Sequence, residues 1–111
     1  MSNGNLVGAW TYEPDSGGAW WSDDFFRILG YQPNEITPSG TVGFSHIHED
    51  DRKRAQMAVA QAVATHGAYD IEKRIVRKDG ETRRVRSLGK MVEDEDGNVF
   101  LSGIFWDLGP G

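Results

Sequence analysis

Cysteine is absent from all 111 residues of the chain. Without thiols the chain can form no disulfide, no thiolate nucleophile, no cysteine-ligated zinc site and no sulfur-linked prosthetic group. Long apolar runs are also missing, since no stretch approaches the ~20 residues that a membrane-spanning helix needs. The first ten residues lack the basic stretch and apolar block of a secretory signal. We therefore expect a cytoplasmic protein that does not insert directly into membranes.

The composition is that of a folded domain. The chain has 38% hydrophobic and 26% charged residues, and its aromatic residues include four tryptophans. Its length predicts a single domain over residues 1–111, because domains commonly contain about 100–150 residues. The net charge of −5 argues against a general phosphate-binding surface, so we expect no nucleic-acid partner.

The first half of the chain reads as two strands followed by short helices. Residues 6–12 and 19–21 are apolar β-formers separated by turn residues, which predicts a hairpin. Ser22 and Gly30 bracket a predicted helix as its N-cap and its C-terminal glycine. Pro33 predicts a further helical turn over residues 33–36. Residues 41–48 are ambiguous and are consistent with one helical turn that presents Phe44 and Ile47.

The second half begins with a long helix and continues with strands. Apolar residues recur at helical spacing from about residue 51 to 66, with Asp50 or Asp51 as the expected N-cap and Gly67 at the end. Residues 68–78 alternate in polarity, and Asp79-Gly80 predicts a tight hairpin turn. Further strands follow at 82–93 and 99–106. The expected class is α+β, with the order β-β-α-α-α-α-β-β-β and helices packed on one face of a five-stranded antiparallel sheet.

Six short motifs stand in this order: Gly8-Ala9-Trp10, Trp21-Ser22-Asp23 before Ile28-Leu29-Gly30-Tyr31, Ile47-His48-Glu49-Asp50-Asp51-Arg52, Glu72-Lys73-Arg74 through Asp79-Gly80, Asp96-Gly97, and Gly103-Ile104 before Asp107-Leu108. Taken together, the chain resembles a PAS sensory domain of bacterial signalling proteins (PAS fold-3 type with a PAC motif). The family typically ends in Asp-Ile-Thr, whereas this chain reads Asp107-Leu108-Gly109, which bears on how a signal leaves the domain.

The resemblance implies a non-catalytic sensor excised from a larger protein. Such a domain senses a small molecule, a redox change or another stimulus, and relays it to an output domain such as a diguanylate cyclase or a histidine kinase. The cofactor is unknown: non-covalent flavin, haem or a small metabolite fits, and none is required. The missing cysteine excludes photochemistry through a thiol adduct. The predicted ligand pocket lies between the helices and the sheet, lined by Phe25, Leu29, Phe44, Ile47, Tyr69 and Ile71.

The last strand predicts a partner surface. Val99, Leu101 and Phe105 point to one side, while Phe100, Ile104 and Trp106 point to the other. Since the helices can cover only one face, the second face should be covered by another subunit, a flanking helix or a neighbouring domain, and of these we expect a homodimer. Phe100, Ile104, Trp106 and Asp107 are the predicted dimer and signal-relay residues. The alternative is a ligand-free dimerisation module whose core is completely filled.

Other chemistry has weaker support in the sequence. Most carboxylates lie in turns or at helix starts, so we expect no catalytic residues. His46, His48 and the acidic residues 49–51 could be drawn together around a metal, and His48 or His66 could ligate haem, but capping and fold roles explain them better. Residues 72–90 hold eight basic side chains against three acidic ones, a local net charge of +5. We expect cross-strand ion pairs there, with the surplus facing water or an acidic partner.

Overall fold

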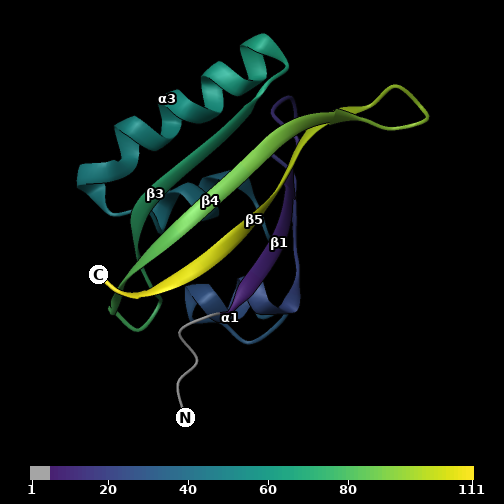
Figure 1. The fold of residues 1–111 in the computed structure, drawn as a ribbon. Helices are drawn as coiled ribbons and strands as arrows, with labels where there is room; N and C mark the ends of the chain where they lie inside the picture. The colour runs from purple at the N-terminus through teal and green to yellow at the C-terminus, as the bar shows by residue number, and fades with distance from the viewer. Residues whose placement is uncertain (1–5) are drawn as a thin grey trace.

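The computed structural model describes residues 6–111, which form one antiparallel sheet with helices beside it (Figure 1). The strands are β1 (Val7–Tyr12), β2 (Ala19–Trp21), β3 (Ala68–Val76), β4 (Thr82–Glu93) and β5 (Val99–Pro110). The helices are α1 (Asp23–Leu29), α2 (Gly40–Ser45) and α3 (Glu49–Thr65). The strand order is β2-β1-β5-β4-β3, so the first and last strands in sequence are neighbours at the centre. The predicted α+β class with a five-stranded antiparallel sheet is confirmed.

The described residues contain three helices, and the expected fourth, at residues 33–36, is a turn. The Glu35 amide donates to the Gln32 carbonyl over 3.0 Å, and Asn34 has a φ of 64°. Pro at the second position and a left-handed residue at the third are typical of a type II turn. The predicted order with four helices is therefore wrong by one element.

The ends of α3 also differ from expectation. Its N-cap is His48, whose Nδ1 accepts from the Asp50 amide over 3.1 Å, and neither Asp50 nor Asp51 caps the helix. Its C-cap is His66 in the left-handed conformation, with φ of 51°. Asp51 lies in the first turn of α3 and is buried, because it binds a strand instead of capping a helix.

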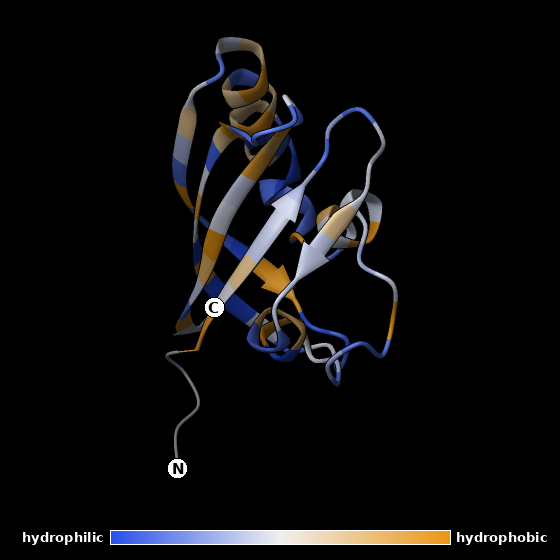
Figure 2. Ribbon diagram, turned by 90° about the vertical axis from the view of Figure 1, so that its right-hand side faces the viewer, coloured by the Kyte–Doolittle hydropathy of each residue, from blue (hydrophilic) through white to orange (hydrophobic). Residues whose placement is uncertain are grey.

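Strand register places every second residue against the helices. Along β5, the inward side chains Leu101 and Phe105 are buried, whereas Ile104 and Trp106 are exposed on the opposite face. In Figure 1, α1 and α2 lie behind the sheet and α3 runs beside β3. Hydrophobic and hydrophilic residues alternate along the strands in Figure 2, as expected when only one face is covered.

Two facing glycines let an indole lie flat on the sheet. Gly89 and Gly103 are paired across β4 and β5, and the Trp10 ring from β1 covers them. A Cβ at Gly103 would lie 1.9 Å from the Leu88 carbonyl oxygen and 2.6 Å from Trp10 Cζ2. Trp10 in turn stacks on Tyr69, with ring centroids 6.4 Å apart. Aromatic rings therefore lie against the inner face of the sheet.

Candidate functional site

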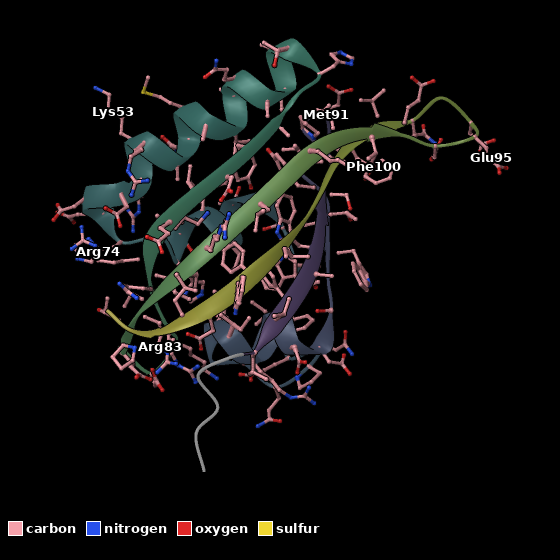
Figure 3. The ribbon with its side chains drawn as sticks, in the orientation of Figure 1. Lys53, Arg74, Arg83, Met91, Glu95 and Phe100 are labelled. Carbon is pink, nitrogen blue, oxygen red and sulfur yellow. The ribbon has the colours of Figure 1, made fainter. Side chains whose placement is uncertain are left out.

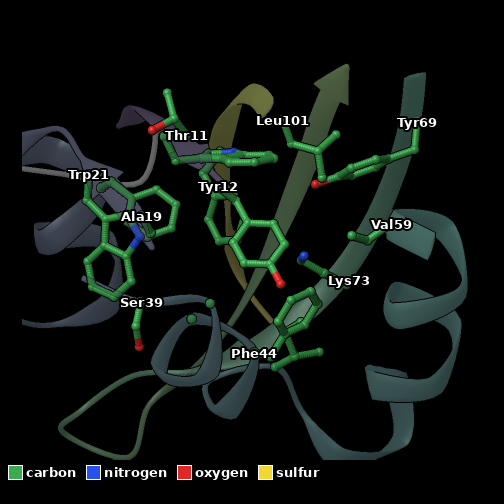
Figure 4. Close-up of a pocket in the computed structure, with 16 residues that line it drawn as sticks. Thr11, Tyr12, Ala19, Trp21, Ser39, Phe44, Val59, Tyr69, Lys73 and Leu101 are labelled. Carbon is green, nitrogen blue, oxygen red and sulfur yellow. The ribbon is translucent and has the colours of Figure 1, made fainter. Parts of the chain in front are cut away.

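An aromatic cavity lies between the helices and the inner face of the sheet. Its volume is about 70 Å³. Its walls come from β1, β2, α1, α2, α3, β3 and β5, and include Trp10, Tyr12, Trp21, Phe25, Phe44 and Phe105. These rings form edge or tilted pairs, such as Tyr12 with Phe44 and Phe25 with Phe105. Segments distant in the sequence thus line one mainly apolar space (Figure 4).

The predicted pocket residues fall into two groups. Phe25, Phe44, Ile47 and Tyr69 line the cavity. Leu29 is buried in the hydrophobic core behind it, and Ile71 lies on β3 without lining it. That any of them binds a ligand stays a prediction.

The sequence analysis missed the most unusual cavity residue, Lys73. It was counted with the solvent-facing basic residues of the β3–β4 hairpin, yet its side chain is only 6% exposed and points into the cavity in Figure 4. Its Nζ lies 4.9 Å from the centre of the Phe105 ring. The pKa of Lys73 is lowered to about 8, mainly by burial and also by the positive charge of Arg54, while the negative charge of Asp51 acts in the opposite direction.

No carboxylate within residues 6–111 forms an ion pair with Lys73, because the nearby Asp51 is fully engaged elsewhere. Asp51 accepts from the Arg74 amide over 2.8 Å and from the Arg74 guanidinium over 3.1 and 2.9 Å. These bonds lower the pKa of Asp51 to about 2, with the Arg74 side-chain hydrogen bond as the largest cause. The pair fastens α3 to β3 and leaves the ammonium of Lys73 without a counter-ion.

The Tyr69 hydroxyl and the Trp10 indole N–H add two buried polar groups to the lining of the cavity. The Tyr69 hydroxyl lies 3.3 Å from Ser87 Oγ, and burial raises the pKa of Tyr69 to about 12. The Trp10 indole Nε1–H is buried, and nothing in the described chain accepts from it. Tyr69 therefore stays protonated and neutral at physiological pH, leaving Lys73 as the charged group of the cavity.

The outer face of the sheet carries a second feature, an exposed apolar patch. Trp20 is 55% exposed, Val7 47%, Trp106 40% and Ile104 38%. Val7 pairs with Trp106 across β1 and β5, and Ala9 pairs with Ile104. We call Val7, Trp20, Ile104 and Trp106 the outer patch. The predicted orientation of Ile104 and Trp106 is confirmed, whereas Val7 and Trp20 were not anticipated.

The other two predicted relay residues lie apart from this patch. Phe100 is half-buried and lies where β4 and β5 extend toward the loop bearing Glu95 (Figure 3). Asp107 is buried on the helix side of the sheet, opposite Val85, and forms a bidentate ion pair with Arg83 over 2.9 and 3.0 Å. A bulge at Arg84 and Val85 shifts the register there. Asp107 therefore anchors the end of β5 and does not face the outer patch.

The histidines do not line the cavity. His46 bonds the Tyr31 hydroxyl and the Val76 carbonyl, both over 2.7 Å, while His48 and His66 cap α3. Neither His48 nor His66 lines the aromatic cavity, so neither is placed to ligate a haem within it. Across residues 6–111, no three His, Asp or Glu side chains gather in a way that could hold a metal ion.

The sequence signals for the missed residues are visible in retrospect. Tyr69, Ile71 and Ile75 set the inward face of β3, and Lys73 shares their parity. Adjacent Trp20 and Trp21 on one strand must point in opposite directions, so one of them had to face outward.

Comparison with known proteins identifies the domain type. The family model for the PAS fold matches residues 19–105. This chain belongs to the PAS-fold family. A crystal structure of a sensory box histidine kinase/response regulator from Burkholderia thailandensis matches the PAS domain with a TM-score of 0.77 and 27% identity, over 94% of this chain and 78% of that one.

Two curated relatives are much longer than the domain. A blue-light-activated histidine kinase of Brucella ovis is 34% identical over 102 residues, which are 92% of this chain and 20% of that protein. The Escherichia coli protein named "Probable diguanylate cyclase DgcE" is 27% identical over 103 residues, 92% of this chain and 9% of that protein. The chain is thus a PAS sensory domain homologous to those attached to output domains in histidine kinases and diguanylate cyclases. No helix in residues 6–111 is long and apolar enough to cross a membrane.

Proposed function

We propose that this PAS domain is a non-catalytic, cytoplasmic regulatory module that binds a small ligand in the aromatic cavity and relays its presence through a homodimer to an attached output domain. The output domain would be of the kind found in the relatives, a diguanylate cyclase or a histidine kinase. The observation that carries the proposal is the position of β5, which contributes side chains both to the cavity and to the outer patch.

The size of the cavity favours a small metabolite over a large chromophore. Sites for drug-sized ligands commonly occupy about 300–1,000 Å³. The present cavity, at about 70 Å³, is several times smaller. Flavin or haem would require the aromatic walls to move apart, whereas a molecule of a few atoms fits the space as it stands.

The outer patch supports dimerisation with a second copy. Its four apolar side chains come from three neighbouring strands, and no segment of residues 6–111 covers them. Contiguous exposed apolar surface of this kind commonly marks a protein–protein contact. Two-fold pairing of identical patches is the commonest way to bury such a surface, because each copy supplies both halves of the contact.

Strand β5 offers a short route from ligand to dimer. Leu101 and Phe105 line the cavity, while Ile104 and Trp106 belong to the outer patch. A shift of Phe105 on ligand binding therefore displaces backbone that also carries its neighbours Ile104 and Trp106. The relay requires the ligand to prefer one arrangement of this strand over the other.

Trp106→Glu tests the dimer. We expect the substitution to lower self-association, measured by sedimentation or light scattering across a concentration series, while far-UV circular dichroism stays unchanged. Met57→Glu is the matched control, because Met57 is 62% exposed on α3 and does not belong to the outer patch. A dimer that persists in Trp106→Glu, or a wild-type chain that stays monomeric at high concentration, would refute the proposed surface.

The small cavity also favours a second function, a ligand-free dimerisation module. In that case association would be the whole activity and the cavity only a packing defect. Screening the purified domain for bound or added small molecules by native mass spectrometry separates the two, because only the sensor retains or gains a ligand mass.

A further inference from the structure

Lys73 is the only charged residue among the described residues that line the cavity. The rest of the lining is apolar, aromatic or neutral, and the Lys73 side chain points into the cavity in Figure 4. A buried cation is tolerated when it is paired or when solvent reaches it. Here the ammonium lies over the face of the Phe105 ring, 4.9 Å from its centre.

The neighbouring charged residues do not provide Lys73 with a counter-ion. Asp51 and Arg54 on α3 are the charged groups that act on it most, and they have opposite signs. Asp51 is held by three hydrogen bonds from Arg74, so its negative charge is already matched. The cavity therefore has one uncompensated positive charge surrounded by apolar walls.

We propose that the cavity binds a small monocarboxylate, whose carboxylate group pairs with Lys73 Nζ and whose short apolar tail lies among the aromatic rings. This inference rests on the proposed function, since it names the ligand class for the same cavity. One negative charge balances one ammonium; a dianion would leave a second charge unpaired among rings that offer it no counter-ion.

The volume limits the length of the tail. A water-sized group needs about 10–15 Å³ of cavity measured in this way. A cavity of about 70 Å³ therefore accommodates roughly five to seven non-hydrogen atoms. Propionate, butyrate and valerate fall in this range, so butyrate is the natural probe.

The first test compares butyrate with butyramide, which has the same shape without the charge. Trp10 and Trp21 line the cavity, so tryptophan fluorescence and calorimetry both report binding. We expect butyrate to bind at least ten-fold more tightly, because a hydrogen bond to a charged group is worth about a factor of ten to a hundred in affinity. Equal affinities for the two compounds, or no binding of butyrate, overturns the inference without any variant.

The second test uses Lys73→Met, which keeps the length of the side chain and removes its charge. We expect butyrate affinity to fall about ten- to a hundred-fold. Lys53→Met is the matched control, since Lys53 is exposed on α3 and points away from the sheet (Figure 3), and it should leave affinity unchanged. Undiminished binding in a folded Lys73→Met variant refutes the assignment. If that variant does not fold, Lys73→Gln provides the same comparison.

The third test is the pH dependence of butyrate affinity in the wild-type domain. The groups facing Lys73 are Asp51 and Arg54 from α3, Tyr12 from β1 and Tyr69 from β3. Between pH 7 and 9.5 butyrate stays ionised while Lys73 loses its proton, so affinity should fall in this range. An affinity that does not change with pH contradicts pairing with Lys73.

These outcomes are distinguishable from failure of the proposed function. A domain that dimerises through Trp106 but ignores butyrate refutes the ligand class and leaves the dimer relay intact. A monomeric domain that binds butyrate only when Lys73 is present refutes the relay and supports the ligand site.

Discussion

Replacing the buried lysine of the cavity should stabilise the domain. In Lys73→Met the ammonium is lost while the side chain keeps nearly the same length and becomes wholly apolar. The site is 6% exposed and offers the charge no carboxylate in the described chain. Removing an unpaired buried charge relieves its desolvation, so the free energy of unfolding should rise.

The size of the gain follows from the pKa of Lys73. Burial lowers this pKa from 10.5 to about 8. Because a tenfold change in an equilibrium constant corresponds to about 1.4 kcal/mol, the protonated side chain costs the folded state about 3 kcal/mol at pH 7. Loss of the contact between the ammonium and the Phe105 ring offsets about 1 kcal/mol. The expected net gain is therefore about 2 kcal/mol.

The stability of the wild type relative to Lys73→Met should change with pH in a defined direction. Between pH 8 and 10.5 the unfolded chain binds a proton at Lys73 that the folded chain has released, so wild-type stability rises with pH over this window. Lys73→Met lacks this group, and its advantage over wild type should shrink as pH increases from 8 toward 10.5. Groups common to both proteins cancel in the difference.

Urea denaturation at pH 7, 8.5 and 10 measures both the stability difference between Lys73→Met and wild type and the change of that difference with pH. Lys53→Met serves as the control and should change stability by less than about 0.5 kcal/mol, as is usual for exposed positions. A Lys73→Met variant that is less stable than wild type at pH 7, or a difference independent of pH, would show that the ammonium is adequately solvated or paired and would refute the reasoning.

Two further substitutions test the ion pair and the close glycine packing that surround the cavity. Asp51→Asn should lower stability by about 2 kcal/mol in thermal or urea unfolding, because it breaks the pair with Arg74. In the wild type, the stability that this pair contributes should be lost as the pH falls from 3.8 to about 2, because the pKa of Asp51 is lower in the folded than in the unfolded chain. Gly103→Ala should cost more than about 2 kcal/mol, since its Cβ would collide with backbone and with Trp10. Gly43→Ala, whose Cβ would meet an ordinary contact at 3.6 Å, is the control and should be neutral or stabilising.

The architecture was predictable because its signals are local. Alternating polarity on both sides of Asp79-Gly80 predicts the β3–β4 hairpin, and the small-residue stripe from Ala55 to Val63 predicts α3. The turn at Pro33 was misread because a proline followed by a residue able to adopt positive φ suits a type II turn as well as a helix start. Only the φ of Asn34 distinguishes the two.

The cavity was harder to predict because its chemistry depends on contacts between distant segments. Most of its aromatic walls follow from hydrophobic patterning, yet patterning assigns a lysine to solvent. Lys73 is buried because its strand parity points it inward and because α3 closes over β3 through Asp51 and Arg74. No sequence pattern within a single segment shows that the Arg74 guanidinium already pairs with the carboxylate of Asp51.

The flat seating of Trp10 on Gly89 and Gly103 has a consequence for how this sequence can evolve. Neither glycine can gain a side chain while the indole stays in place, and a Cβ would also meet the Leu88 carbonyl oxygen at position 103 and the Tyr69 ring at position 89. The indole therefore restricts both positions to glycine among descendants of this domain, and its loss does not by itself release either of them. Homologues that retain the indole should retain both glycines.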